Sequence, residues 1–125
     1  MIRINELRVG NLLQCNSTKE YRQVTITDLL DLSESNDAFD YCPIDINKKI
    51  LLRFGFSELP KDKKAFKDKL LFQHGENAER ILWSGGCVLK PSDNGGYIII
   101  AWNILYAHRL QNLYHAIKGE ELGYE

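Results

Sequence analysis

The chain has 125 residues, of which 44% are hydrophobic and 26% charged, and its formal net charge is −1. This is the composition of one ordinary globular domain, and the bulk charge does not favour binding of a polyanion. No run approaches the roughly 18 apolar residues of a membrane span, so we expect no contact with a membrane. The stretch Met1–Glu6 is charged early and lacks the apolar region of a signal peptide, and we expect a cytoplasmic protein.

The three cysteines, Cys15, Cys42 and Cys87, are widely spaced and odd in number. A structural zinc site needs four ligands, commonly in close pairs, and no Cys-x-x-Cys pair is present. We expect reduced, mostly buried thiols.

The first predicted elements are a pair of strands. Leu12–Cys15 is a short apolar strand, Asn16–Glu20 is a polar turn, and Tyr21–Thr27 is a returning strand rich in β-branched residues. This hairpin, which Gly10 introduces, is similar in topology to SH3-like small barrels.

The next segment is expected to stay extended. Leu29–Leu32 continues the strand into the acidic loop Ser33–Asp40, and Phe39–Tyr41 supplies another short strand. Pro43 ends that strand because it has no backbone N–H for the ladder.

A short helix is predicted next. Apolar side chains recur at helical spacing in Ile46–Phe54, with Asp45 as the expected N-cap and Gly55 as the stop. Phe56 is expected to pack back onto the end of this helix.

A meander of strands follows the charged, proline-containing connector Ser57–Lys64. The connector is expected to separate two subdomains, a β-rich part at residues 1–60 and a second part at residues 61–125. The double-glycine turns Gly85-Gly86 and Asn94-Gly95-Gly96 are hairpin signals. The four expected strands are Leu70–Gln73, Arg80–Trp83, Cys87–Lys90 and Tyr97–Trp102.

The last third organises the predicted fold. Tyr97–Trp102 has apolar side chains on both faces, which predicts a central strand. Ile104–Lys118 predicts a helix, with Asn103 as N-cap and Gly119 as terminator. Its apolar stripe consists of Tyr106, Leu110, Leu113, Tyr114 and Ile117. We therefore predict an α+β protein: an N-terminal β hairpin or small SH3-like barrel, a short linking helix, and a four-stranded antiparallel meander capped by the C-terminal helix.

Charge is segregated along the chain. The stretch Asp28–Asp45 has six acidic and no basic residues, and Lys48–Lys69 has eight basic and three acidic ones. Such blocks mark an interface, or they face each other or water. Within the second block, lysines alternate with Asp and with Phe66, a pattern that a nucleic-acid-binding face would combine with exposed aromatic residues. The candidate binding lysines are Lys61, Lys63, Lys64 and Lys67.

A polar row is predicted on the final helix, where His108, Asn112 and His115 lie opposite the apolar stripe. The i, i+7 spacing of the two histidines does not suit one metal ion, because helical chelation uses i, i+4. The row is either a surface for a protein partner or a nucleic-acid backbone, or the solvated face of the helix. An enzyme would need these histidines to converge with His74 in a cleft.

No motif for catalysis or for a cofactor is present. Ser84-Gly85-Gly86 lacks the pattern of a nucleophile elbow, and neither glycine turn has the form of a phosphate-binding loop. The acidic residues lack the spacing of a calcium loop. We therefore predict no catalytic, cofactor-binding or metal-binding residues.

Three short motifs resemble, in the same order, those of a group of short uncharacterised proteins of Bacteroides-type bacteria and their phages or prophages. They are Asn5–Asn11 near the start, Leu51–Phe56 in the middle and Ala107–Tyr114 near the end. The resemblance implies a gut-bacterial or mobile-element setting and supplies no catalytic residue. The leading hypothesis is a non-enzymatic accessory or interaction module with a protein partner. The alternatives are nucleic-acid binding through Lys61–Lys69 and, least favoured, an enzyme with a histidine-containing cleft.

Overall fold

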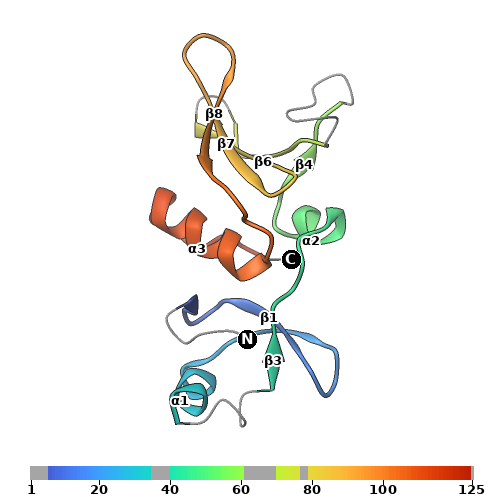
Figure 1. Cartoon of the computed structure of the whole chain (residues 1–125), viewed down its shortest axis with the longest axis vertical. Coiled ribbons are helices and arrows are strands. Elements are labelled where there is room, and N and C mark those ends of the chain that lie inside the picture. The colour runs from blue at the N-terminus through green and yellow to red at the C-terminus, as the bar shows by residue number, and fades with distance from the viewer. Residues whose placement is uncertain (1–5, 35–39, 61–69, 77–78, 125) are drawn as a thin grey trace. The chain divides into compact units, whose positions relative to one another are not determined.

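The computed structural model describes residues 6–34, 40–60, 70–76 and 79–124. These residues form eight strands and three helices (Figure 1). In chain order the elements are β1 (Leu12–Cys15), β2 (Tyr21–Gln23), α1 (Ile26–Glu34), β3 (Tyr41–Cys42), α2 (Lys48–Arg53), β4 (Ser57–Glu58), β5 (Phe72–His74), β6 (Ile81–Ser84), β7 (Cys87–Pro91), β8 (Tyr97–Ala101) and α3 (Ala107–Lys118). The α+β class that the sequence predicts is confirmed.

The chain divides into two compact units. The first comprises residues 1–46 and 106–122, and the second comprises residues 47–105 and 123–125. This division differs from the boundary expected near residue 60, because the chain returns to the first unit with α3. No helix in the described part of the chain is both long and apolar enough to cross a bilayer.

The first unit contains an antiparallel sheet in the order β2-β1-β3. Its apolar core is formed by Leu7, Leu13, Val24 and Leu32, against which Leu29 and Tyr41 pack. α3 contacts β1 in the same unit. The three short strands form an open sheet, so the closed SH3-like barrel is not found among the described residues.

Helix α1 replaces the strand continuation predicted for this region. Strand β2 ends at Gln23, and α1 then occupies Ile26–Glu34. The side chain of Thr25 accepts a hydrogen bond from Asp28 N–H (3.2 Å), and the Asp28 carboxylate accepts one from Thr25 N–H (2.8 Å). This reciprocal capping box satisfies two backbone donors at the helix start. It outweighs the β-branched composition that favoured a strand.

Helix α2 confirms the predicted short helix with a different cap. Asn47 Oδ1 accepts from Ile50 N–H (2.9 Å), so Asn47 is the N-cap and the expectation of Asp45 is wrong. Gly55 stops the helix as predicted, with φ at +89°. Phe56 N–H donates to Leu51 O (2.9 Å) and Gly55 N–H to Leu52 O (3.0 Å), the pattern of a Schellman motif.

The second unit is a five-stranded antiparallel sheet in the order β4-β5-β6-β7-β8. The four predicted meander strands are confirmed, and β4 adds a fifth from the connector. Gly85 and Gly86 both have positive φ (56° and 93°), which the two-residue turn between β6 and β7 requires. Leu71, Leu82 and Leu89 form the core, with Leu59 and Ile99 packed against it.

Two predictions about the last third are wrong. β8 lies at the edge of the sheet, with β7 as its neighbour, and not at its centre (Figure 1). The final helix begins at Ala107 with Tyr106 as N-cap, while Asn103 has φ of +56° and precedes the helix. Helix α3 groups with β1 in the first unit, while the meander forms the second unit. Gly119 ends the helix as predicted, with φ of +73°.

Candidate functional site

The structure separates the three members of the polar row predicted on α3. His108 is fully buried, and its Nε2 lies 3.4 Å from Glu6 Oε1. Asn112 is half-buried and donates to Glu6 O (2.7 Å). His115 is exposed. Two of the three residues therefore stabilise the interior of the first unit, and the row forms no continuous binding surface.

Arg8 connects α3 to the start of the described chain. Its Nε donates to Asn112 Oδ1 (2.8 Å), and Asn11 Nδ2 donates to the same oxygen (2.8 Å). A further guanidinium nitrogen of Arg8 forms an ion pair with Glu121 (2.5 Å), which lowers the pKa of that exposed carboxyl group. The first and last resemblance motifs, Asn5–Asn11 and Ala107–Tyr114, thus hydrogen-bond to each other. Their polar residues serve the fold.

The surroundings of His108 favour the neutral form of its imidazole. Burial lowers its pKa, and the neighbouring Glu6 carboxylate opposes that change only in part. A carboxylate accepts hydrogen bonds, so Nε2 carries the ring proton, while buried Nδ1 has no hydrogen-bond partner among the described residues. The ring stacks on Tyr106, with centroids 6.0 Å apart. These features belong to a structural group whose charge state depends on pH.

The four candidate lysines, Lys61, Lys63, Lys64 and Lys67, lie outside the described residues. The division of charge between the units is nevertheless defined by the sequence. The first unit has six Lys and Arg against ten Asp and Glu, a net charge of −4, and the second has ten against seven, a net charge of +3. The acidic and basic blocks of the sequence therefore fall in different units.

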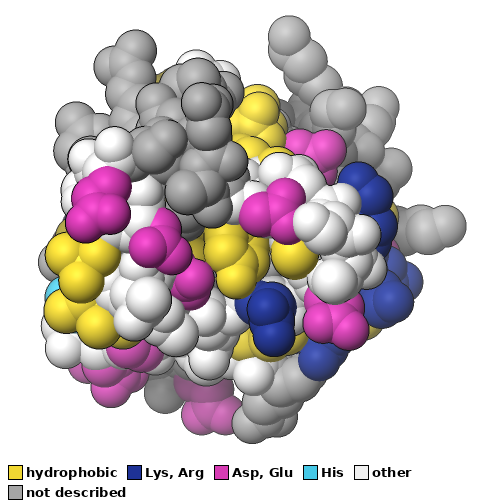
Figure 2. Space-filling view, turned by 90° about the horizontal axis from the view of Figure 1, so that it is seen from below, with side chains coloured by type: hydrophobic (Ala, Val, Ile, Leu, Met, Phe, Trp, Pro, Cys, Tyr) yellow, Lys and Arg dark blue, Asp and Glu magenta, His cyan; other side chains and the backbone are white. Residues whose placement is uncertain are grey.

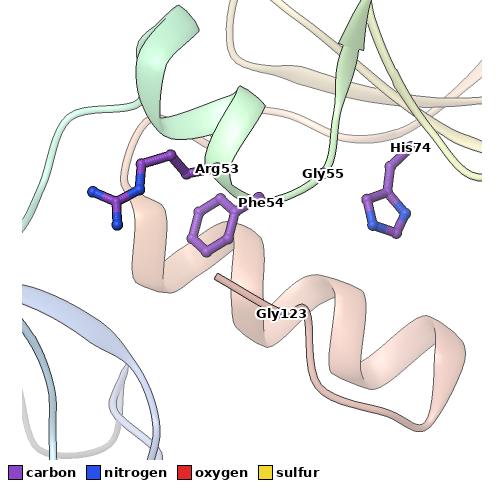
Figure 3. A pocket seen from close by; sticks show the side chains of 5 residues that line it. All are labelled: Arg53, Phe54, Gly55, His74 and Gly123. Atoms are coloured by element: carbon purple, nitrogen blue, oxygen red, sulfur yellow. The ribbon is translucent and has the colours of Figure 1, made fainter. Parts of the chain in front are cut away.

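A pocket of about 220 Å³ lies in the second unit, beside the resemblance motif Leu51–Phe56. It is lined by Arg53, Phe54, Gly55, His74 and Gly123 (Figure 3). Figure 3 shows the Arg53 guanidinium pointing away from the His74 ring, with Phe54 between them. The two polar groups do not converge on one point, so the pocket offers no acid–base pair for catalysis.

A wider hollow of about 530 Å³ lies in the first unit, lined by Arg22, Gln23, Thr25, Asp28 and Tyr41. The Asp28 carboxylate already accepts hydrogen bonds in the cap of α1, and a hydrogen bond to Tyr41 raises the pKa of Arg22.

On the face drawn in Figure 2, acidic side chains lie among apolar ones, and basic ones gather toward one side. Across the described chain, no group of three or more His, Cys, Asp or Glu residues is arranged to hold a metal ion.

The strongest candidate site is the outer edge of β8, which pairs with β7 and with no other strand in the described part of the chain. Ser92 N–H donates to Gly96 O (2.9 Å) at the start of the β7–β8 ladder. The register then pairs Pro91 with Tyr97, Lys90 with Ile98 and Leu89 with Ile99. Hydrogen-bonded and non-hydrogen-bonded pairs alternate in an antiparallel ladder. The N–H and C=O groups of Ile98 therefore face β7, and those of Tyr97 and Ile99 face outward.

The side chains along this edge are apolar and uncharged from Tyr97 to Trp102. Tyr97 is 39% exposed, Ile98 46%, Trp102 63% and Leu105 50%. Ile104 N–H donates to Gly86 O (2.8 Å), and the Trp83 indole N–H donates to Ile104 O (2.9 Å). These bonds fix the segment that carries Trp102 and Leu105 against the β6–β7 turn. Exposed apolar groups thus extend from the strand onto a fixed loop.

The opposite edge of the sheet differs. β4 has only two residues, Ser57 and Glu58, and Pro60 follows shortly after. Glu58 also forms an ion pair with Lys48 (2.8 Å). Short length, charge, proline and β-bulges protect a sheet edge against pairing. β8 has five residues and neither charge nor proline, and its pairing with β7 shifts register between Leu89–Ile99 and Val88–Ala101.

Sequence reasoning missed this site, although the composition of Tyr97–Trp102 held a signal. A run of apolar residues on both strand faces was assigned to the sheet centre, where it would be covered. Its lack of charged residues equally suits an edge that a partner covers.

Searches of protein-family models, of curated proteins and of solved structures each found no match for the chain.

Proposed function

We propose that the protein is a non-enzymatic interaction module that binds an extended protein segment by strand addition to β8. One observation carries the proposal: the outward backbone groups of Tyr97 and Ile99 lie on a strand that has no charged residue. Strand addition uses such groups for affinity and the flanking side chains for specificity. Tyr97 and Ile98 supply those side chains, and both are partly exposed.

The expected affinity is modest. Each backbone hydrogen bond contributes a net ~0.5–1.5 kcal/mol, and burial of apolar surface contributes about 25 cal/mol per Å². Ordering of the bound segment and loss of its free rotation offset much of this gain. A dissociation constant on the order of micromolar, about −8 kcal/mol, is therefore expected.

The test uses random octapeptides displayed on phage and selected on the purified protein. Selected peptides should be rich in β-branched and aromatic residues and should lose at least tenfold in affinity for Ile98→Lys. The matched control is Leu52→Lys, which adds the same charge at an equally exposed apolar position of α2. Equal binding of the peptides to Ile98→Lys and to the wild-type protein would refute the proposal.

Nucleic-acid binding is a second candidate, and the net charge of +3 on the second unit favours it. Phosphate contacts release counterions, so this reading requires an affinity that falls steeply with salt. A mobility-shift titration with single-stranded and double-stranded DNA and RNA at about 50 mM salt tests it. The absence of any shift at that salt concentration would eliminate the candidate.

A further inference from the structure

We propose that the β8 edge selects an extended protein segment with an acidic residue between two apolar ones, and that Lys90 makes this selection. The inference rests on the proposed function, because it names the class of segment that the same edge binds. It follows from the register of β7 and β8 and from the positive charge that lies one strand inside the edge.

The register confines the pairing to a short part of the partner. The outward backbone groups belong to Tyr97 and Ile99. Beyond Ile99 the register shifts and Ala101 pairs with Val88 of β7, so the alternation of outward groups ends there. A segment added antiparallel, as in every described strand pair of this sheet, bonds to Tyr97 and Ile99 and has one residue between those two contacts. That middle residue lies opposite Ile98.

The two faces of the edge differ in chemistry. Partner residues opposite Tyr97 and Ile99 have their side chains on the same face as these two residues. Ile99 packs against the leucine core of the second unit and Tyr97 is partly exposed, so this face favours apolar partner side chains. The middle residue has its side chain on the other face, next to Ile98 and then Lys90, which the register pairs with Ile98.

The charge of Lys90 is available to a partner. Lys90 is exposed, and it forms no ion pair with any residue that the structure describes. Asp93, the nearest acidic residue along the chain, is exposed in the turn between β7 and β8 and is not paired with it either. A glutamate on the partner would therefore meet an ammonium group that has no described carboxylate beside it.

The distance suits an ion pair across Ile98. The middle residue of the partner lies two strand spacings from Lys90, about 9.6 Å between Cα atoms. The flexible four-carbon stem of lysine and the shorter stem of glutamate together span this distance over the Ile98 side chain, with both charged ends in water. Because the pair is exposed, it should change the affinity only about two- to fivefold. Backbone pairing and apolar contacts supply the affinity, and Lys90 supplies a preference among segments.

The test starts from the tightest displayed octapeptide that binds the wild-type protein and loses affinity for Ile98→Lys. Each position of the peptide is replaced in turn by Glu, Gln and Lys, and binding is measured by fluorescence polarisation at about 50 mM salt, where charges are weakly screened. At one position Glu should bind about two- to fivefold more tightly than Gln, and Lys more weakly by a similar factor.

Two charge reversals in the protein assign the preference to a residue. In Lys90→Glu the order of Glu and Lys at that peptide position should reverse. Lys49→Glu is the matched control, because it makes the same change of charge at another exposed lysine of the second unit, and it should leave the order unchanged. Far-UV circular dichroism and the melting temperature verify that both variants are folded.

The outcomes separate this inference from the proposed function. A peptide without any position that prefers Glu, or a preference that Lys90→Glu leaves unchanged, overturns the selection by Lys90, while strand addition to β8 stands. A reversal in Lys49→Glu as well also overturns it, since the preference then follows the charge of the whole unit. If no displayed peptide loses affinity for Ile98→Lys, both proposals fail.

Discussion

The buried amide of Gln111 offers the sharpest test of how α3 is held in the first unit. Gln111 is 1% exposed. Its Oε1 accepts from Leu12 N–H (2.6 Å), and its Nε2 donates to Gly10 O (3.2 Å). One side chain of the last helix thus completes the backbone hydrogen bonding at the start of β1. We predict that Gln111→Leu, similar in volume but unable to hydrogen-bond, strongly destabilises the protein.

The magnitude follows from the two groups that lose their partner. An unsatisfied buried donor or acceptor costs about 1–3 kcal/mol, so the two backbone groups together cost roughly 2–6 kcal/mol. The leucine recovers part of this through apolar burial, up to about 2 kcal/mol. The middle of these two ranges, about 4 less about 1 kcal/mol, gives an expected net loss of about 3 kcal/mol. That is a large fraction of the 5–15 kcal/mol that holds an average domain folded.

Urea unfolding followed by far-UV circular dichroism measures the change in free energy of unfolding. Gln14→Leu is the matched control, because Gln14 Nε2 donates to the exposed Lys19 O (3.1 Å), which water can bind instead. It should cost less than about 0.5 kcal/mol, as surface changes usually do. The amide of Leu12 should also exchange faster in Gln111→Leu. Equal stability of the two variants, or an unchanged Leu12 amide, would refute the reasoning.

Three further predictions concern other parts of the chain. Burial, and to a smaller extent the positive charge of Arg109, lower the pKa of His108, and the Glu6 carboxylate opposes them only in part. The unfolded state therefore takes up this proton at a higher pH than the folded state, just below about pH 6.5. On acidification below about pH 6.5, the free energy of unfolding should therefore fall by up to about 1.4 kcal/mol per pH unit. The fall should be steeper in the wild-type protein and in His115→Gln than in His108→Gln. Urea unfolding at several pH values between about 7.5 and 5 measures it. Gly86→Ala should cost about 1–3 kcal/mol, like Gly95→Ala, since both glycines have positive φ. Adding Leu105→Ala to Gly86→Ala should recover little of the lost stability. The Leu105 methyl group lies 2.8 Å from the added Cβ, but it is the end of a half-exposed side chain that can move aside, so the strain comes from the backbone. Full recovery of the melting temperature in the double variant would contradict this account. Thr25→Val should lower the free energy of unfolding by about 1 kcal/mol through loss of the α1 cap, and an unchanged urea midpoint would show that the capping box contributes nothing.

Local chemistry made the meander readable from the sequence. Gly85-Gly86 supplies two positive φ values in succession, and Asn94-Gly95-Gly96 supplies the next turn. Between such turns, short apolar runs have room for strands only. The ends of α2 and α3 at Gly55 and Gly119 were predictable for the same reason: each position adopts a left-handed conformation that glycine tolerates.

The candidate site was harder to predict from the sequence, because the position of a strand in a sheet depends on which other strands pair with it. Tyr97–Ala101 has the same composition whether one or two strands pair with it. The apolar pattern of α3 likewise gave no sign that His108 and Gln111 are buried. Their partners Glu6 and Leu12 lie about a hundred positions away in the sequence.

The sequence by itself determined the α+β class, the four strands of the meander and the glycine-terminated helices. Each of these depends on interactions within a few residues, which a local pattern records. Only the tertiary structure decided that α3 belongs with β1, that His108 and Gln111 are buried, and that β8 is the outermost described strand of its sheet. These outcomes depend on hydrogen bonds and packing between distant segments, for which no local pattern contains the information.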